Sequence, residues 1–470
     1  MKRIFSGLTI AALSLCVSVA GPAARAETLA DALASAYNTS GLLEQNRALL
    51  RAADEGVAQA VAALRPVINW SAKYQKQFSK GANASTGFAS TNSDSATLTL
   101  GLTAQLVLYD FGAGKLGVEV AKESVLGARY SLIAVEQQIL FRAVTAFFEV
   151  RRASEFLALR QSNVRLITQE LRAARDRFEV GEVTRTDVSL AEARLAAAKS
   201  GLAAAQGALN RAKLEYGAAV GRDPGRLSAP RGLPRAPKSV EMAMATAVRN
   251  HPEFLAAQKD VTVAELNVTV ADLAIKPTIK GTAGLGLTEN FHNDGFGRSV
   301  TFGLEASGPI YAGGRLSSLQ RQAMARRDAS RSNLHVAAQS VRQSAGNAFS
   351  DVLVSRASRQ AIEQQVRAAQ VAFRGVREET TLGARTTLDV LNAEQELLEA
   401  RANLISAQID EYLGAYRLLA SMGQLTASDL RLNVQIFDPA AYYNMVEKAP
   451  AYHSQQGKKL DKVLRRIGKE

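Results

Sequence analysis

Two short stretches of this chain carry charged residues at spacings that suggest a chemical role. GEVTRTDVSLAEA begins at Gly181 and GARTTLDVLNAEQ begins at Gly383, 202 residues further on. Each contains the Thr-x-x-Asp spacing of a helix capping box, which satisfies free N–H groups in the first helical turn. A carboxylate at this place also suits the helix dipole. Capping alone can therefore explain Asp187 and Asp389.

Arg385 in the second stretch is not explained by capping. It comes just before a predicted helix, where a cation is mildly disfavoured. The position 202 residues earlier holds Val183, so the arginine has no basic counterpart in the first stretch. The alternative to a functional role is a solvated turn residue, and we favour the functional role. Gly181 and Gly383 are interpreted as left-handed caps that end long helices.

Enzymatic chemistry is not indicated anywhere in the chain. The four histidines are not arranged as HExxH, and the one cysteine, Cys16, gives them no thiol partner. No nucleophile with a neighbouring base can be identified. The sequence therefore predicts no enzyme, no metal site and no cofactor.

Long helices must position the two stretches. None of the 11 prolines lies between Pro66 and Pro224 or between Pro309 and Pro439, and helix interiors reject proline. We predict long helices over 114–178, 186–221, 315–380 and 388–422, and shorter ones over 28–64 and 252–275. Coiled-coil packing is indicated by a heptad of small and branched residues. Its members are Val188, Ala191, Leu195, Ala198, Leu202, Ala205, Leu209 and Ala212.

The chain consists of two similar halves. Tyr109 matches Tyr311 at the same offset of 202 residues, and Pro66 matches Pro277 at a slightly larger one. This self-similarity indicates an internal duplication. We predict a signal peptide over 1–26, a first repeat over 27–223, a linker over 224–249, a second repeat over 250–423 and a C-terminal segment over 424–470.

Four segments alternate apolar and polar residues, which indicates β-strands. They cover 69–79, 97–109, 278–288 and 299–307, and their lengths fit the ~9–11 residues of a transmembrane strand. A soluble sheet with one wet face is the alternative, but no segment is available to cover the apolar face. Four strands cannot close a barrel, and a membrane tolerates no open edge. Several chains must therefore share one barrel, two for eight strands or three for twelve.

The N-terminus predicts export. Lys2 and Arg3 precede an apolar stretch and an Ala-x-Ala site at residues 24–26, as in a secretory signal peptide. Cys16 lies inside this signal, and lipid attachment to it fits poorly because Leu15 is not small. The net charge is +13, with six Lys or Arg from Lys458 onward. In an exported chain with 6% aromatic residues we interpret this tail as a solvated, disordered or membrane-proximal extension, not as a nucleic-acid site.

The chain resembles the TolC family of outer-membrane efflux and secretion ducts. The duplication, LYDFGAGK, IYAGGRL, NHPEF, RFEVGEVTRTDV and GARTTLDVLNAEQELLEAR carry the resemblance over about residues 28–437. It implies an α+β membrane protein: a homotrimer with a twelve-stranded transmembrane β-barrel, four strands from each chain, continued by a long periplasmic α-helical barrel. The C-terminal segment would be equatorial. The implied partners are outer-membrane lipid, a periplasmic adaptor (membrane fusion) protein and an inner-membrane ABC transporter or proton-driven pump.

The resemblance also assigns roles to residues in the two turns. Thr186 and Asp187 fall on the family's lock pair and Arg385 on its gate arginine. We hypothesise that Arg385 pairs with Asp187 of a neighbouring helix and holds the tip closed. A lock tyrosine of the family is replaced by Thr380, so that one constraint is predicted to be missing.

A tunnel ring is implied by Asp389, which falls on an aspartate whose copies surround the narrow end of the family's tunnel. A second ring aspartate falls on Asn392, so the ring is predicted to be less negative here. Gly181, Thr184 and Gly383 form the helix-tip turns where an adaptor would dock.

Other functions stay open at this point. An exported structural or adaptor-like coiled coil without a channel is the competing hypothesis, and a lipid-anchored efflux channel is another. A duct of this kind could carry drugs or secreted proteins, and the sequence does not choose between them.

Overall fold

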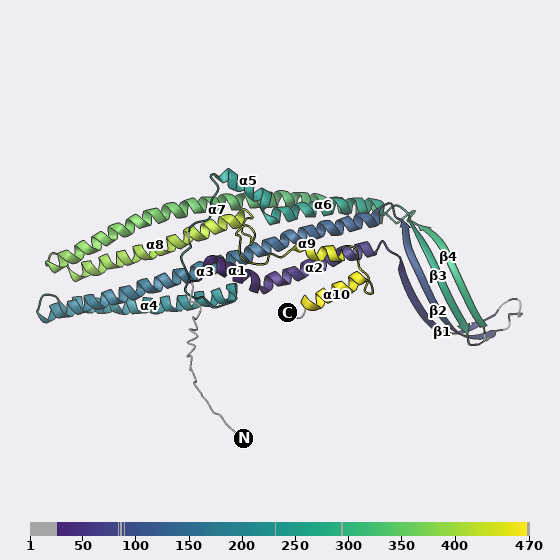
Figure 1. Ribbon diagram of the computed structural model, residues 1–470, viewed down its shortest axis with the longest axis horizontal. Coiled ribbons are helices and arrows are strands. Elements are labelled where there is room, and N and C mark those ends of the chain that lie inside the picture. The colour runs from purple at the N-terminus through teal and green to yellow at the C-terminus, as the bar shows by residue number, and fades with distance from the viewer. Residues whose placement is uncertain are drawn as a thin grey trace, which may run out of the picture.

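The computed structural model describes residues 26–82, 84, 87–88, 90–230, 232–292 and 295–467. The predicted signal peptide and Cys16 lie outside the described residues, apart from Ala26. The molecule is elongated: helices fill most of its length, and one sheet projects from one end (Figure 1).

The elements follow the predicted order in both halves. The first half contains α1 (Leu29–Thr39), α2 (Gly41–Ala62), β1 (Val67–Gly81), β2 (Thr91–Tyr109), α3 (Ala113–Glu179) and α4 (Arg185–Val220). The second half contains α5 (Val240–Asn250), α6 (Pro252–Leu273), β3 (Thr278–Asn290), β4 (Gly295–Ser307), α7 (Arg315–Thr381) and α8 (Thr387–Ser421). The C-terminal segment contains α9 (Pro439–Val446) and α10 (Gln455–Ile467).

Several details differ from the sequence predictions. Strand β2 begins at Thr91, six residues before the predicted start at 97, and β4 begins at Gly295, four residues before the predicted start at 299. The helix predicted over 28–64 is broken at Ser40, whose N–H closes α1 on Ala36 and whose side chain accepts from the N–H of Leu43 to start α2. Helix α5 occupies the end of the segment predicted as a linker. The basic tail, predicted to be disordered, forms α10 as far as the described residues extend.

The four strands form one antiparallel sheet in the order β1-β2-β3-β4. Its register keeps the apolar faces of all strands in phase, since Trp70 faces Leu102, Leu102 faces Leu285 and Leu285 faces Val300. The neighbouring row on the other face is polar or small: Ser71, Gly101, Gly286 and Ser299. The sequence alternation therefore gives one apolar and one polar face.

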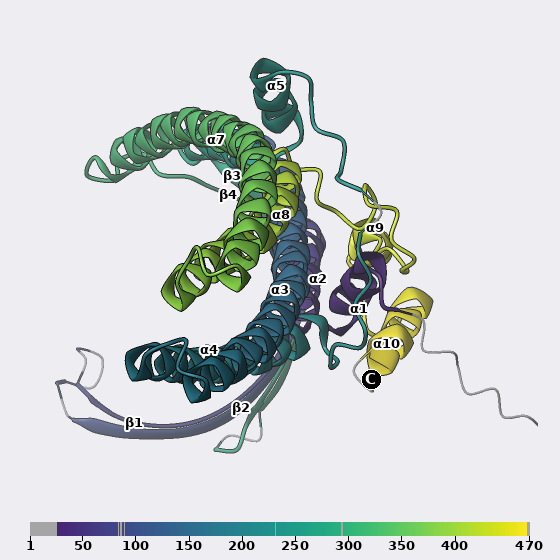
Figure 2. The same ribbon diagram turned by 90° about the vertical axis from the view of Figure 1, so that its left-hand side faces the viewer.

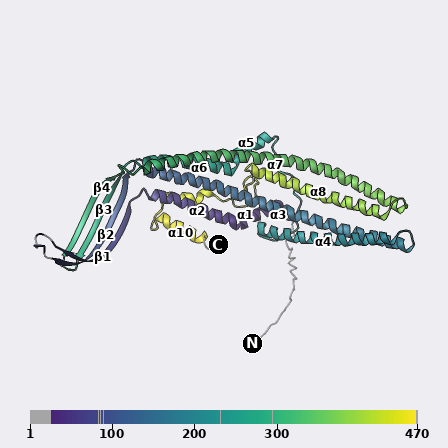
Figure 3. The ribbon, with the colours of Figure 1, turned by 180° about the vertical axis from the view of Figure 1, so that it is seen from behind.

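The apolar face of the sheet has no cover within the described chain. Trp70 is 79% exposed and Phe302 is 83% exposed. A β-bulge between Val107 and Tyr109 sets Tyr109 opposite Ile279 and so adds it to the apolar face. Figure 3 shows the sheet bending away from the helices, with β1 and β4 as free edges.

The helices form two long antiparallel hairpins, α3 with α4 and α7 with α8. Helices α3 and α7 each have 67 residues, which corresponds to about 100 Å at 1.5 Å per residue. Seen along the long axis, the hairpins form a curved wall, with α1, α5, α9 and α10 on its convex side (Figure 2). The main core lies where α1 and α2 pack on α3, around Phe147, Phe148 and Tyr216.

Helix α3 also contains the one apolar window, among the described residues, that is long enough to cross a membrane by length and composition. Half of that window is buried inside the chain. Because this part of α3 packs against α1 and α2, it belongs to the core.

Candidate functional site

The two hairpin turns lie together at the end of the molecule farthest from the sheet (Figure 1). Each turn contains one glycine in the left-handed region, Gly181 with φ 81° and Gly383 with φ 76°. The N–H of Glu182 donates to the carbonyl of Arg177 at 2.9 Å, and the N–H of Ala384 donates to that of Glu379 at 2.9 Å. These bonds satisfy the last carbonyls of α3 and α7, as in a glycine-terminated helix end.

Both predicted capping boxes are formed. The N–H of Thr184 donates to Asp187 Oδ2 at 2.9 Å, and the N–H of Asp187 donates to Thr184 Oγ1 at 3.3 Å. Thr386 and Asp389 repeat the arrangement at 3.0 and 3.3 Å. The bonds from the backbone and side chain of Thr386, together with the nearby Arg385, lower the pKa of Asp389. Asp389 is therefore anionic at neutral pH.

Arg385 finds its partner within its own hairpin. Its Nε donates to Glu379 Oε2 at 3.0 Å, and both side chains are about half exposed. Asp187 and Arg385 line the same cleft of about 580 Å³ between the two turns. The chain thus places both members of the hypothesised latch on one cleft, while Thr186 is exposed in the first turn of α4.

Asn392, the predicted departure in the ring, connects the two hairpins. Its Oδ1 accepts a hydrogen bond from Arg194 Nη2 on α4 at 3.1 Å. Thr380 is buried, and its hydroxyl donates to the carbonyl of Val376 one turn earlier at 2.7 Å. The hydroxyl of Thr380 is thus bonded within α7.

Two further connections between the hairpins were not predicted from the sequence. Asn163 on α3 donates through its amide to Glu394 on α8, which is 5% exposed. Burial raises the pKa of Glu394, and the hydrogen bond from Asn163 opposes the rise. Arg377 on α7 pairs with Glu170 on α3 at 3.3 Å. No motif or period relates positions 231 residues apart, such as 163 and 394.

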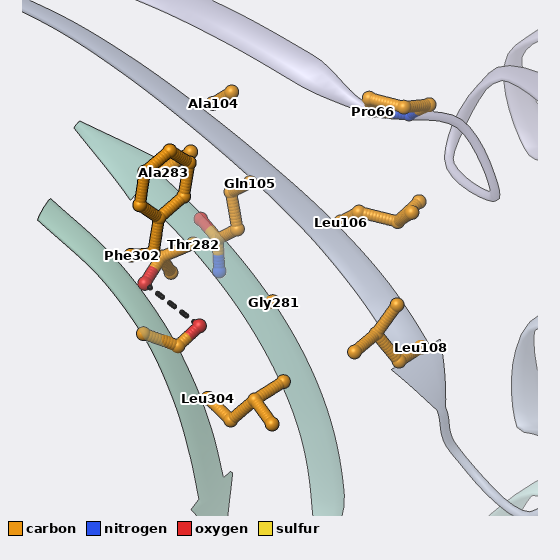
Figure 4. Close-up of a pocket in the computed structure, with 11 residues that line it drawn as sticks. Pro66, Ala104, Gln105, Leu106, Leu108, Gly281, Thr282, Ala283, Phe302 and Leu304 are labelled. Carbon is orange, nitrogen blue, oxygen red and sulfur yellow. Dashed lines mark hydrogen bonds between the residues drawn. The ribbon is translucent and has the colours of Figure 1, made fainter. Parts of the chain in front are cut away.

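A second hollow lies in the sheet, near its junction with the helices. Figure 4 shows Leu106, Leu108 and Leu304 around Gly281 in its lining. The hydroxyl of Thr282 donates to the carbonyl of Gly303 at 3.4 Å beside it. This lining offers little polar chemistry, so we regard it as a dent in the exposed apolar face.

The comparisons with known proteins agree with the duplicated fold. The family model described as outer membrane efflux protein matches twice, over residues 32–222 and 244–424. The outer membrane efflux protein BepC of Brucella suis is 35% identical over 429 residues, which is 91% of this chain and 92% of that protein. The outer membrane protein TolC of Vibrio cholerae is 26% identical, over 92% of this chain and 97% of that one. The alkaline protease secretion protein AprF of Pseudomonas aeruginosa is 27% identical, over 72% of each.

Solved structures share the fold. The CmeC outer membrane channel of Campylobacter jejuni superposes with a TM-score of 0.76 at 15% identity, over 90% of both chains. The outer membrane protein VceC of Vibrio cholerae gives 0.73 at 20% identity, over 84% of this chain and 96% of that one. The predicted fold class is therefore confirmed.

Proposed function

The chain belongs to the outer membrane efflux protein family, and we propose that it is a channel-tunnel gated at the tips of its helix hairpins. It is an outer-membrane protein with a periplasmic extension, and its relatives are channels and not enzymes. The observation that carries the proposal is one open sheet with an uncovered apolar face, joined to two very long hairpins.

The dimensions of the sheet suit a bilayer. Tyr74 lies opposite Leu98, which is 11 residues before Tyr109 on β2. At ~3.3 Å per residue and a tilt of ~40°, those residues span about 28 Å between two aromatic levels. Tyr74 packs near Phe291 at one level and Tyr109 packs on Phe111 at the other. Aromatic girdles at both interfaces are typical of transmembrane barrels.

Three copies would remove both free edges of the sheet. Twelve strands then close one barrel, with the polar face inward and the apolar face toward lipid. The exposed apolar residues Val336 and Val354 support the same assembly for the helices. They lie 18 residues, or five turns, apart and so share one side of α7, which a neighbouring copy can cover.

The gate in this proposal is a weak latch. Arg385 leaves Glu379 and pairs with Asp187 across the tip cleft or with Asp187 of a neighbouring copy. An exposed ion pair of this kind contributes about 0.2–1 kcal/mol, so the exchange costs little. Asp389 and Asn392 would surround the narrow end. Gly181, Thr184 and Gly383 would belong to the surface on which a periplasmic adaptor docks.

We further propose that the tunnel works with that adaptor and an inner-membrane ABC transporter or proton-driven pump. BepC is named as an efflux protein and AprF as a secretion protein, so drugs and secreted proteins are both candidate cargo. We also propose the predicted domain boundaries, which run from a signal peptide over 1–26 to an equatorial segment and tail over 424–470.

Planar-bilayer conductance of the purified protein tests the channel and the latch together. We expect the wild type to conduct weakly and Arg385→Gln to conduct more. Arg185→Gln is the matched control, because it removes the basic residue of the other turn. Equal conductance in the two variants would refute the latch. A wild type that fractionates away from the outer membrane and forms no channel would instead support the exported coiled coil.

A further inference from the structure

Helix α10 separates its apolar and basic residues onto opposite faces. Leu460, Val463 and Leu464 follow the spacing of one helical face. The opposite side, here called the basic face, carries five exposed cations: Lys458, Lys459, Lys462, Arg465 and Arg466. In a surface helix with this division the apolar side packs on the protein and the charged side faces outward.

The apolar side of α10 already has its partner inside the chain. Leu460 is buried in a cluster with Ala58 of α2 and with Tyr442 and Val446 of α9. The hydroxyl of Tyr442 donates to Glu55 Oε1 on α2 at 2.6 Å. Helix α10 is thus held on the equatorial segment, and its basic face must point away from the wall.

The segment before α10 is fixed to the base of the sheet. Arg65, between α2 and β1, donates through Nη1 to the carbonyl of Ala449 at 2.7 Å and through Nη2 to the carbonyl of Lys448. The segment that leads into α10 is therefore anchored at the junction of the helices and the sheet.

The basic face carries an excess of positive charge. None of its five cations forms an ion pair with any residue that the structure describes. Lys458, Lys462, Arg465 and Arg466 line a hollow of about 380 Å³, together with Asp461, Tyr452 and His453. A concave surface lined by four cations concentrates positive potential and attracts anionic groups.

The position of α10 indicates which anionic partner the basic face can reach. It lies on the convex side of the helical wall with α1 and α9 (Figure 2). It runs alongside α2, away from the sheet and roughly along the length of the molecule (Figure 1). The basic face therefore looks sideways into the periplasm that surrounds the tube, and lipid headgroups would meet only the end of α10 nearest the sheet.

We propose that the basic face of α10 binds the carboxylate-bearing peptide stems of the cell wall, the acidic polymer that surrounds such a tube in the periplasm. The binding holds the channel in the wall and is separate from conduction and from the hairpin tips. Because the contacts are exposed ion pairs, the affinity falls as salt rises.

Co-sedimentation of the full-length purified protein with isolated peptidoglycan sacculi tests the proposal. The test variant carries Lys458→Gln, Lys462→Gln, Arg465→Gln and Arg466→Gln. The matched control removes four exposed cations from α3 and α4 by Arg172→Gln, Lys199→Gln, Arg211→Gln and Lys213→Gln. Size-exclusion chromatography and bilayer conductance verify that both variants remain assembled and conduct.

We expect the wild type and the control to bind, and the test variant to bind about tenfold more weakly. Sacculi whose carboxylates have been amidated should no longer bind the wild-type protein. Failure of the wild type to bind sacculi, or equal binding by the test variant, would overturn the proposal. Binding to vesicles of anionic phospholipid but not to sacculi would also overturn it, in favour of a lipid surface.

Discussion

Removing the amide of Asn163 tests how the two hairpins are held together. In Asn163→Ala the carboxyl of Glu394 remains buried between α3 and α8 without this donor. A buried polar group that loses its partner costs about 1–3 kcal/mol. Because the contact joins the hairpins, we expect that cost to appear in the local opening of α8, with the rest of the fold intact.

Hydrogen exchange followed by mass spectrometry measures that opening. A cost of about 1–3 kcal/mol corresponds to exchange about 5- to 150-fold faster for amides around Glu394. Gln395→Ala is the control, because it changes the neighbouring residue on α8, whose amide donates to Glu399 at 2.7 Å on the exposed side. Peptides of α10 serve as an internal reference.

The double variant Asn163→Ala with Glu394→Ala sharpens the test. Replacing both partners removes the orphaned carboxyl, so it should slow exchange relative to Asn163→Ala alone. If Asn163→Ala and Gln395→Ala exchange equally fast, the connection does not hold the hairpins and the reasoning fails.

Three further predictions concern the turns, the core and the ring. Gly383→Ala should destabilise the protein by about 1 kcal/mol because φ is positive at Gly383. Gly375 lies inside α7 with free space where a Cβ would be, so Gly375→Ala should stabilise the protein by up to about 1 kcal/mol. Melting temperatures that shift in the same direction in both variants would contradict this reasoning. Burial raises the pKa of Asp54 to about 6, so stability should fall as the pH rises from about 4 to about 6. Asp54→Asn should then raise the melting temperature by about 2 °C at pH 8 and by less at pH 4. An equal rise in melting temperature at both pH values would contradict the raised pKa of Asp54. Asp389→Asn should lower the preference of the channel for cations, measured by reversal potentials in bilayers. An unchanged preference would show that Asp389 does not belong to a tunnel ring.

Periodicity was sufficient to predict the long elements. The proline-free stretches and the heptad from Val188 predicted α3, α4, α7 and α8 to within two residues. The break at Ser40 was missed because a helix cap is a local hydrogen bond inside an otherwise helical pattern. Helix α10 was not predicted because the tail was interpreted from its charge alone. The helical spacing of Leu460, Val463 and Leu464 was not considered.

The candidate site was only partly predictable. The glycine caps and capping boxes are local, and the sequence contains them. The partner of Arg385 depends on which rotamer reaches Glu379 six residues away, which no spacing rule decides. Asn163 and Glu394 meet only because the two halves fold side by side, so their contact is a property of the tertiary structure.

The unequal lengths of the strands have a consequence at the cell surface. Strands β1 and β2 have 15 and 19 residues, whereas β3 and β4 have 13 each. The connection between β1 and β2 is also longer, residues 82–90 against 291–294. A barrel of three copies would therefore carry tall and short hairpins in alternation around its rim. An antibody or phage that recognises the tall hairpin would find three equivalent epitopes on each tube, although the structural repeat occurs six times around it.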